Sequence, residues 1–184
     1  MKTELMKNDD RSEAIRAVLL SGLLSDPQLQ QFLDSLIERA LRRVLGLPGC
    51  FQWTGRASWD AWAVKILHSK DRASLSLLRA TDRAIARTTE EAQQTARDGA
   101  AYDAEPIWAA AEASRAAIEA SRASKSSRAS KNRHASEASW SAIRTASSAA
   151  VALFGSSPRV TEAIEAEREQ QYQDLLSLIS TMEA

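Results

Sequence analysis

The chain has 184 residues, 44% of them hydrophobic, and its 24 basic residues balance its 24 acidic ones. This hydrophobic content is enough for a core and excludes general disorder. The zero net charge excludes a global field that would attract nucleic acid or anionic lipid. A single cysteine, Cys50, excludes an internal disulfide and a zinc site built on cysteines. We expect a cytoplasmic protein, because the first residues lack the apolar core of a signal peptide and no apolar run is long enough to span a bilayer.

Two helices are predicted at the start of the chain. Residues 10–21 carry apolar side chains at helical spacing, and Gly22 is a typical stop. Ser25, Asp26 and Pro27 open a second helix, whose strong apolar stripe ends near Gly46. We expect residues 1–46 to form a helical hairpin packed on the main body. A loop over 47–57 and a helical bundle over 58–184 complete one structural unit.

The remaining elements also read as helices. We expect helices over Ser58–Ser69, Asp71–Arg87 and 88–99, then the Ala/Ser-rich segment from Pro106, and a last helix that begins at Ser157–Pro158. No segment shows the period-2 alternation of a half-buried strand. The prediction is an all-α bundle of seven or eight helices with no sheet.

The Ala/Ser-rich segment is the most unusual feature of the chain, because 27 of the 44 residues from Ala109 to Ala152 are Ala or Ser. Alanine is the best helix former but buries little surface, so these helices must gain stability by close approach. A single helix from Pro106 to Phe154 would be roughly 70 Å long, against a radius of gyration of about 16 Å for a compact chain of this size. We therefore favour a break near Ser130–Asn132 and a close-packed pair, with one projecting helix as the alternative. The small residues predicted to line the seam are Ala109, Ala113, Ala116, Ala120, Ala123, Ser127 and Ser130.

Basic side chains are concentrated in the same segment. They are Arg115, Arg122, Lys125, Arg128, Lys131, Arg133 and Arg144, against Glu119 and Glu137. One interpretation is contact with an acidic protein or with phosphates of nucleic acid. The other is a solvated face, or pairing with acids of the last helix. Those acids are Glu162, Glu165, Glu167, Glu169 and Asp174.

Tryptophans supply the apolar candidates for contact. Trp53 lies in a loop between two glycines, where it can either pack over the core or serve as an exposed anchor for a partner. Trp108 and Trp140 stand near the two ends of the Ala/Ser-rich segment. We expect both to fill places where the small-residue seam gives way to ordinary packing.

The sequence contains few of the residue patterns that are typical of catalytic or metal-binding sites. The two histidines, His68 and His134, are 66 residues apart, and neither has a glutamate three residues before it, as a di-iron bundle would require. Glu162, Glu165 and Glu169 share one helical face but read as surface residues. No phosphate-binding loop or nucleophile elbow is present. We expect no cofactor, no metal and no enzymatic activity, with an enzyme of unknown type as the alternative.

The segment from Trp59 to Val151 resembles a family of small, Ala-rich helical bacterial immunity proteins. The matching stretches are ASWDAWAVKIL, AIARTTEEAQQTARDGA and IWAAAEASRAAIEASRA. The serine excess and the cations of residues 122–133 depart from the family pattern. The resemblance implies a binding or neutralising role.

These observations together predict a non-enzymatic helical protein that binds another protein. The candidate contacts are the cations of residues 115–133 and Trp53. A nucleic-acid-binding accessory subunit that uses the same cations is the first alternative. The small-residue seam can pack within the chain or against a second copy, so the oligomeric state stays open.

Overall fold

The computed structural model of the chain describes residues 8–69 and 101–180, together with residues 87, 88, 90, 91, 94, 95 and 97. The described residues form helices and no strand, which confirms the all-α fold. The predicted count of seven or eight helices is not matched, because the described part holds six. The helices predicted over 71–87 and 88–99 lie mostly outside the described residues. The bounds are α1 (Asn8–Ser21), α2 (Asp26–Leu45), α3 (Arg56–His68), α5 (Ala101–Lys125), α6 (Arg128–Phe154) and α7 (Pro158–Ser180).

Several helix ends follow their local sequence signals. Gly22 has a φ of 69°, a left-handed conformation that glycine adopts without strain, and it ends α1 as predicted. Pro158 begins α7, where its missing N–H is not needed. Three starts were predicted too late, among them that of α1, which begins at Asn8 and not at residue 10. α3 begins two residues before Ser58, and α5 begins at Ala101, so that Pro106 lies inside the helix.

The Ala/Ser-rich segment forms two helices, α5 and α6, and they are separated at Ser126 and Ser127. The predicted break lay about four residues further on. Ser127 is extended, with φ −60° and ψ 158°, and its carbonyl accepts the N–H of Lys131 at 2.8 Å, so α6 restarts at once. The side chain of Asn132 does not compete with the helix, because it donates to the carbonyl of Leu20 in α1 at 3.3 Å.

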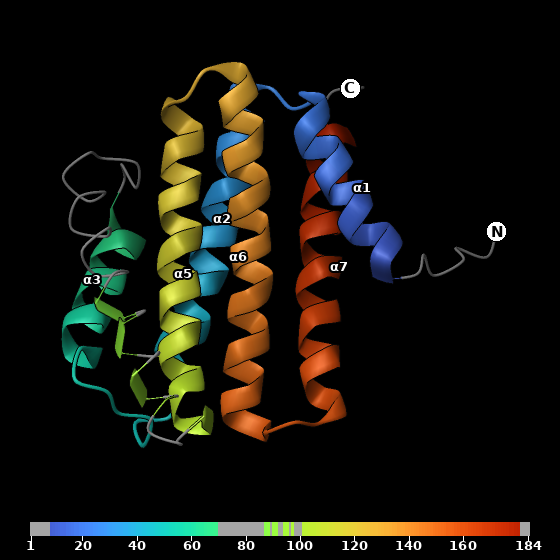
Figure 1. Cartoon of the computed structure of the whole chain (residues 1–184). Coiled ribbons are helices and arrows are strands. Elements are labelled where there is room, and N and C mark those ends of the chain that lie inside the picture. The colour runs from blue at the N-terminus through green and yellow to red at the C-terminus, as the bar shows by residue number, and fades with distance from the viewer. Residues whose placement is uncertain are drawn as a thin grey trace.

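α5, α6 and α7 lie side by side and alternate in direction, and α2 runs in the same direction as α6 (Figure 1). α5 and α6 form an antiparallel pair, with α2 packed behind both, and α7 lies beside α6. α3 covers one edge of this bundle, and α1 covers the other by packing on α7 and α6. The predicted division into a hairpin over 1–46 and a bundle over 58–184 stays a prediction; in the structure, α2 contacts α3, α5, α6 and α7.

The core joins one helix of large side chains to two helices of small ones. α2 buries a row of bulky residues that includes Phe32, Leu36 and Leu41, and this row meets the alanines of α5 and α6. Large side chains on one helix therefore fill the volume that alanines leave, which keeps the interior densely packed. The predicted seam is confirmed in α5, where five alanines are buried. They are Ala109, Ala113, Ala116, Ala120 and Ala123. Ser127 is exposed and Ser130 half-buried, because both lie beyond the end of α5.

Arg56 organises the loop between α2 and α3. Its guanidinium donates to the carbonyls of Leu47 at 2.9 Å, Pro48 at 3.0 Å and Phe51, and it lies 5.2 Å from the centre of the Trp53 ring. Three main-chain acceptors in an irregular segment are thereby satisfied by one buried side chain. The fixed fork of arginine donors suits this arrangement, whereas lysine is a single point of charge.

Replacing Arg56 with lysine is expected to lower the free energy of unfolding by about 2 kcal/mol, because buried carbonyls lose their donors. Guanidinium denaturation followed by circular dichroism measures the change. Arg42→Lys is the matched control: Arg42 is exposed and pairs only with Glu38 among the described residues. We expect the control to change stability by less than about 0.5 kcal/mol. Equal effects of the two substitutions would show that the loop does not depend on Arg56.

Candidate binding groove

Three of the six cations predicted to bind a partner are already in ion pairs within the chain, and so is Arg144. Arg115 and Arg144 both contact Oε1 of Glu112, at 2.9 and 3.2 Å. Arg122 contacts Glu119 at 2.7 Å, and Lys131 of α6 contacts Asp26 of α2 at 2.7 Å. Lys125 and Arg133 are exposed and make no ion pair with any residue that the structure describes, and the side chain of Arg128 lies outside the description.

The acids that pair with these cations are not the ones that the sequence suggested. Pairing with acids of the last helix was one of the alternatives, but the acidic partners come from α5 and α2. The acids of α7 contact arginines of α1 and α2 instead: Glu167 binds Arg39 and Arg43, Asp174 binds Arg39, and Glu169 binds Arg11. The reason is packing, because α7 lies against α6, α1 and α2, whereas α5 lies on the other side of α6.

The anchor role considered for Trp53 is wrong. Only 8% of its surface is exposed, and its ring packs in the core against the guanidinium of Arg56. The loop is held closed by Arg56, so the flanking glycines do not expose the indole. Of the two predictions for this residue, packing over the core is confirmed.

Trp140 is the tryptophan that the structure exposes, with 48% of its surface accessible. The expectation that it fills a gap in the packing is therefore wrong. It lies on the outer face of α6, in a row with Arg133, Glu137 and Arg144 at spacings of three and four residues. This pattern was a usable signal, because a tryptophan flanked by charged residues on one helical face points toward solvent.

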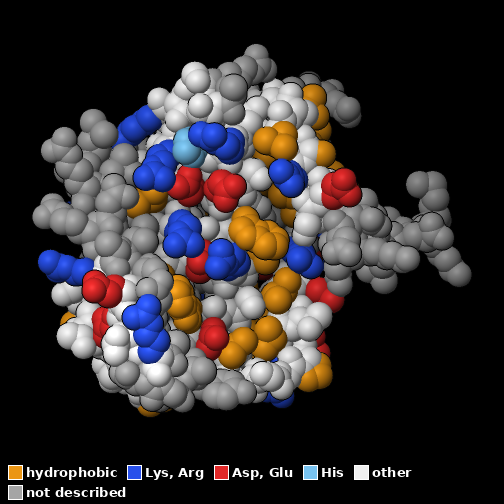
Figure 2. Space-filling view, viewed as in Figure 1, with side chains coloured by type: hydrophobic (Ala, Val, Ile, Leu, Met, Phe, Trp, Pro, Cys, Tyr) orange, Lys and Arg blue, Asp and Glu red, His pale blue; other side chains and the backbone are white. Residues whose placement is uncertain are grey.

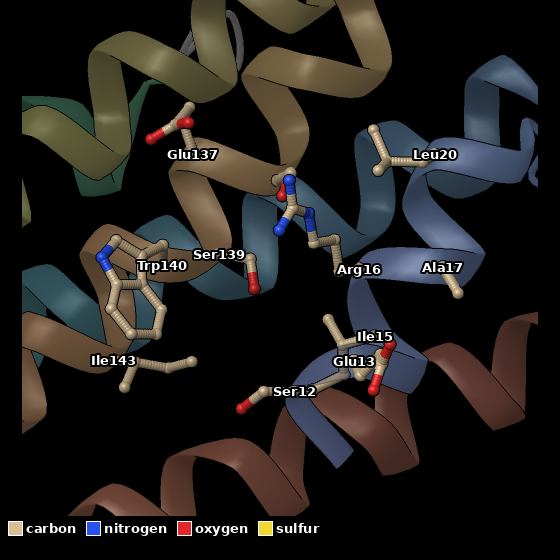
Figure 3. A pocket seen from close by; sticks show the side chains of 11 residues that line it. Ser12, Glu13, Ile15, Arg16, Ala17, Leu20, Glu137, Ser139, Trp140 and Ile143 are labelled. Atoms are coloured by element: carbon tan, nitrogen blue, oxygen red, sulfur yellow. The ribbon is translucent and has the colours of Figure 1, made fainter. Parts of the chain in front are cut away.

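A groove of about 760 Å³ lies between α1 and α6, and Trp140 forms part of one wall (Figure 3). Its apolar lining comes from both helices. The residues are Ile15, Ala17 and Leu20 of α1 with Trp140 and Ile143 of α6. Leu20 is exposed, like Trp140, whereas Ile15 and Ile143 are buried. The groove therefore presents apolar surface to solvent above a packed floor.

Polar residues make up six of the eleven that line the groove. Hydroxyls come from Ser12, Ser136 and Ser139, and charges from Arg16, Glu13 and Glu137. The Oγ of Ser12 is buried and has no hydrogen-bond partner among the described residues. Ser139 donates to Oε1 of Gln171 at 2.5 Å, which ties one wall of the groove to the buried polar side chains of α7. The groove therefore combines apolar and polar side chains in similar number.

Hydrophobic side chains gather where α6 meets α1, and both basic and acidic side chains lie around them (Figure 2). Arg16 lines the groove and makes no ion pair with any described residue. On the side of α5, one buried acid, Glu112, is shared by Arg115 and Arg144. The charged residues in the lining itself are therefore one arginine, Arg16, and two glutamates, Glu13 and Glu137.

The histidines do not assemble a catalytic site with the groove. His68 is exposed near the end of α3, with Nδ1 2.8 Å from the carbonyl of Val64. His134 pairs with Glu119, at 2.6 Å between Nδ1 and Oε2, and does not line the groove. Among the residues that the structure describes, no three His, Cys, Asp or Glu side chains are grouped closely enough to hold a metal ion. No helix in the described ranges has both the length and the apolar character that a membrane crossing requires.

Comparisons of the chain with models of protein families, with curated proteins and with solved structures found no match.

Proposed function

We propose that this chain is a non-enzymatic protein that binds another protein, and that the contact is centred on the groove between α1 and α6. The exposure of Trp140 in the wall of this groove carries the proposal. Tryptophan is strongly enriched among the residues that dominate binding energy at protein interfaces, together with arginine. Here Arg16 lines the same groove, and Arg133 and Arg144 lie on the same face of α6 as Trp140.

The arrangement suits a protein partner better than nucleic acid. Phosphate binding needs several free cations along a track, and most cations of the Ala/Ser-rich segment are already paired with acids. An apolar groove with a charged rim matches the anatomy of a protein interface. The resemblance to immunity proteins agrees with this function, since a rigid helical face can bind a toxin and block its active surface.

Photo-crosslinking tests the proposal. A photoreactive amino acid replaces Ser136, which also lines the groove, in the full chain, and the crosslinked partner from the native host is identified and purified. The complex is then reconstituted, and its affinity is measured for the unchanged chain and for Trp140→Ala. We expect Trp140→Ala to weaken binding about 30-fold, which corresponds to an interface hot spot of about 2 kcal/mol.

Val64→Ala is the matched control, because Val64 is also an exposed apolar residue but lies on α3, at the opposite edge of the bundle. The control should bind as the unchanged chain does. A reconstituted complex that tolerates Trp140→Ala would contradict the proposal. A crosslinked species that nuclease digestion removes would favour the nucleic-acid alternative instead.

A further inference from the structure

We infer that two copies of the free chain associate through the exposed face of α6, about a two-fold axis next to Trp140. This inference goes beyond the proposed function and does not rest on it. Three observations carry it: an exposed row along α6, an acid and a cation on that row that the chain leaves without full compensation, and their positions on either side of one exposed indole.

The row lies on the side of α6 that its neighbours leave uncovered. α6 contacts α5, α7, α2 and α1, which bury most of its alanines. The residues that stay exposed or half-buried follow one another at alternating spacings of four and three, so they form one continuous row. They are Arg133, Glu137, Trp140, Arg144, Ser147, Val151 and Phe154. A row with this spacing is the kind that packs along another helix.

Two charges on this row are not fully compensated within the described chain. Glu137 is exposed and makes no ion pair with a described residue. Arg144 contacts Oε1 of Glu112 at 3.2 Å, but the same oxygen binds Arg115 at 2.9 Å, so one carboxylate serves two guanidinium groups. The side chain of Arg144 is 52% exposed, and a guanidinium has five donors. Each copy therefore presents one acid and one net positive charge on the same face.

Two-fold symmetry brings these two charges together. Glu137 and Arg144 are seven residues apart, so an axis between residues 140 and 141 places each of them roughly 5 Å away along the helix. When two copies run antiparallel about this axis, Glu137 of one faces Arg144 of the other, and the symmetry forms this pair twice. A parallel arrangement would instead place each charge opposite an identical one, which is repulsive.

The same axis brings the two exposed indoles next to each other. Trp140 is half-exposed in the free chain, and a contact between the two rings removes apolar surface from water. The side chains that flank the row are small, because they include Ser136 and Ser148, so the two helices can approach closely. A partner protein that covers Trp140 would compete with the second copy for this face.

Sedimentation velocity over a wide range of concentration tests the association. We expect the unchanged chain to shift toward twice its mass as its concentration rises. Trp140→Ala removes the apolar contact, and Glu137→Arg places an arginine opposite Arg144, so each is expected to weaken association at least about 10-fold. Both positions are exposed, and circular dichroism verifies that the variants fold.

Glu90→Arg is the matched control for the charge reversal. Glu90 is also an exposed acid, and the neighbouring Glu91 accepts the main-chain N–H of Thr54 in the loop before α3, away from the exposed face of α6. The control should associate as the unchanged chain does.

Disulfide formation tests the antiparallel register. In a Cys50→Ser background, one chain carries Glu137→Cys and a second carries Arg144→Cys, and the two are mixed under mild oxidation. We expect the disulfide between the two different chains to exceed both symmetric disulfides, because position 137 faces position 144. The mixed dimer also keeps one complete pair, formed by the Glu137 and the Arg144 that were not replaced.

Three results would overturn the inference. They are a chain that stays monomeric at every concentration, a dimer that tolerates both Trp140→Ala and Glu137→Arg, and a predominance of the symmetric disulfides. The proposed function is decided separately, by the affinity of the purified partner. A monomeric chain that still binds this partner through Trp140 would overturn the dimer and leave the proposed function standing.

Discussion

Replacing Glu167 with alanine is expected to lower the free energy of unfolding by about 3–5 kcal/mol, the effect of removing one partner from a buried ion pair. The carboxylate of Glu167 is fully buried in α7. It accepts hydrogen bonds from Arg39 at 3.3 Å, from Arg43 at 2.9 Å and from the amide of Gln171 at 3.0 Å. Without it, Arg43 loses the only described acid with which it forms an ion pair, and Arg39 keeps only its contact with Asp174 at 2.6 Å.

Urea denaturation of the purified chain measures this change, and Glu169→Ala is the matched control. Glu169 lies two residues away in the same helix and also pairs with an arginine, Arg11 at 3.1 Å, but its side chain is 42% exposed. An exposed pair of this kind contributes about 0–1 kcal/mol. If Glu167→Ala were no more destabilising than Glu169→Ala, the buried cluster would not hold α7 to α2.

The second large effect is expected from Ala116→Leu. Ala116 is completely buried in α5 and belongs to the core formed with α2 and α6. A leucine there adds three carbon atoms where helices approach closely, so side chains or helix axes must move. We expect a loss of about 3 kcal/mol, at the upper end of the range for overpacking.

Ala166→Leu is the matched control for this substitution, because Ala166 is exposed on α7. Leucine and alanine are both strong helix formers, so the two variants differ mainly in the surroundings of the new side chain. Thermal denaturation followed by circular dichroism compares them. A chain that accepts leucine at position 116 as easily as at 166 would show that the seam does not require small residues.

Local signals in the sequence were enough to predict most of the helices in the described part. Gly22, Pro158 and the apolar stripe of α2 mark features that depend on neighbouring residues alone. The alanine seam of α5 was predictable for a related reason: a helix with few large side chains must pack through small ones. Breaks that depend on tertiary contacts were placed less well. Asn132, for example, bonds to α1 and leaves the helix intact.

Local patterns in the sequence could not predict the candidate groove. The groove is formed by α1 and α6, so its lining depends on which helices pack together, and no spacing in the sequence reports that. The cluster at Glu167 has the same origin, because Arg39 and Arg43 lie more than 120 residues away along the chain. The exposure of Trp140 could have been predicted from the sequence, because its neighbours at helical spacing, Glu137 and Arg144, are charged.

The groove has a thermodynamic consequence because its walls come from helices that are far apart in the chain. Unfolding separates α1 from α6, so a molecule that bridges the two walls binds only the native state. Such a ligand raises the stability of the whole chain by about 2.7 kcal/mol when its free concentration is 100 times its dissociation constant. A shift in melting temperature therefore reports occupancy of the groove without any label. Candidate partners can then be screened by thermal denaturation.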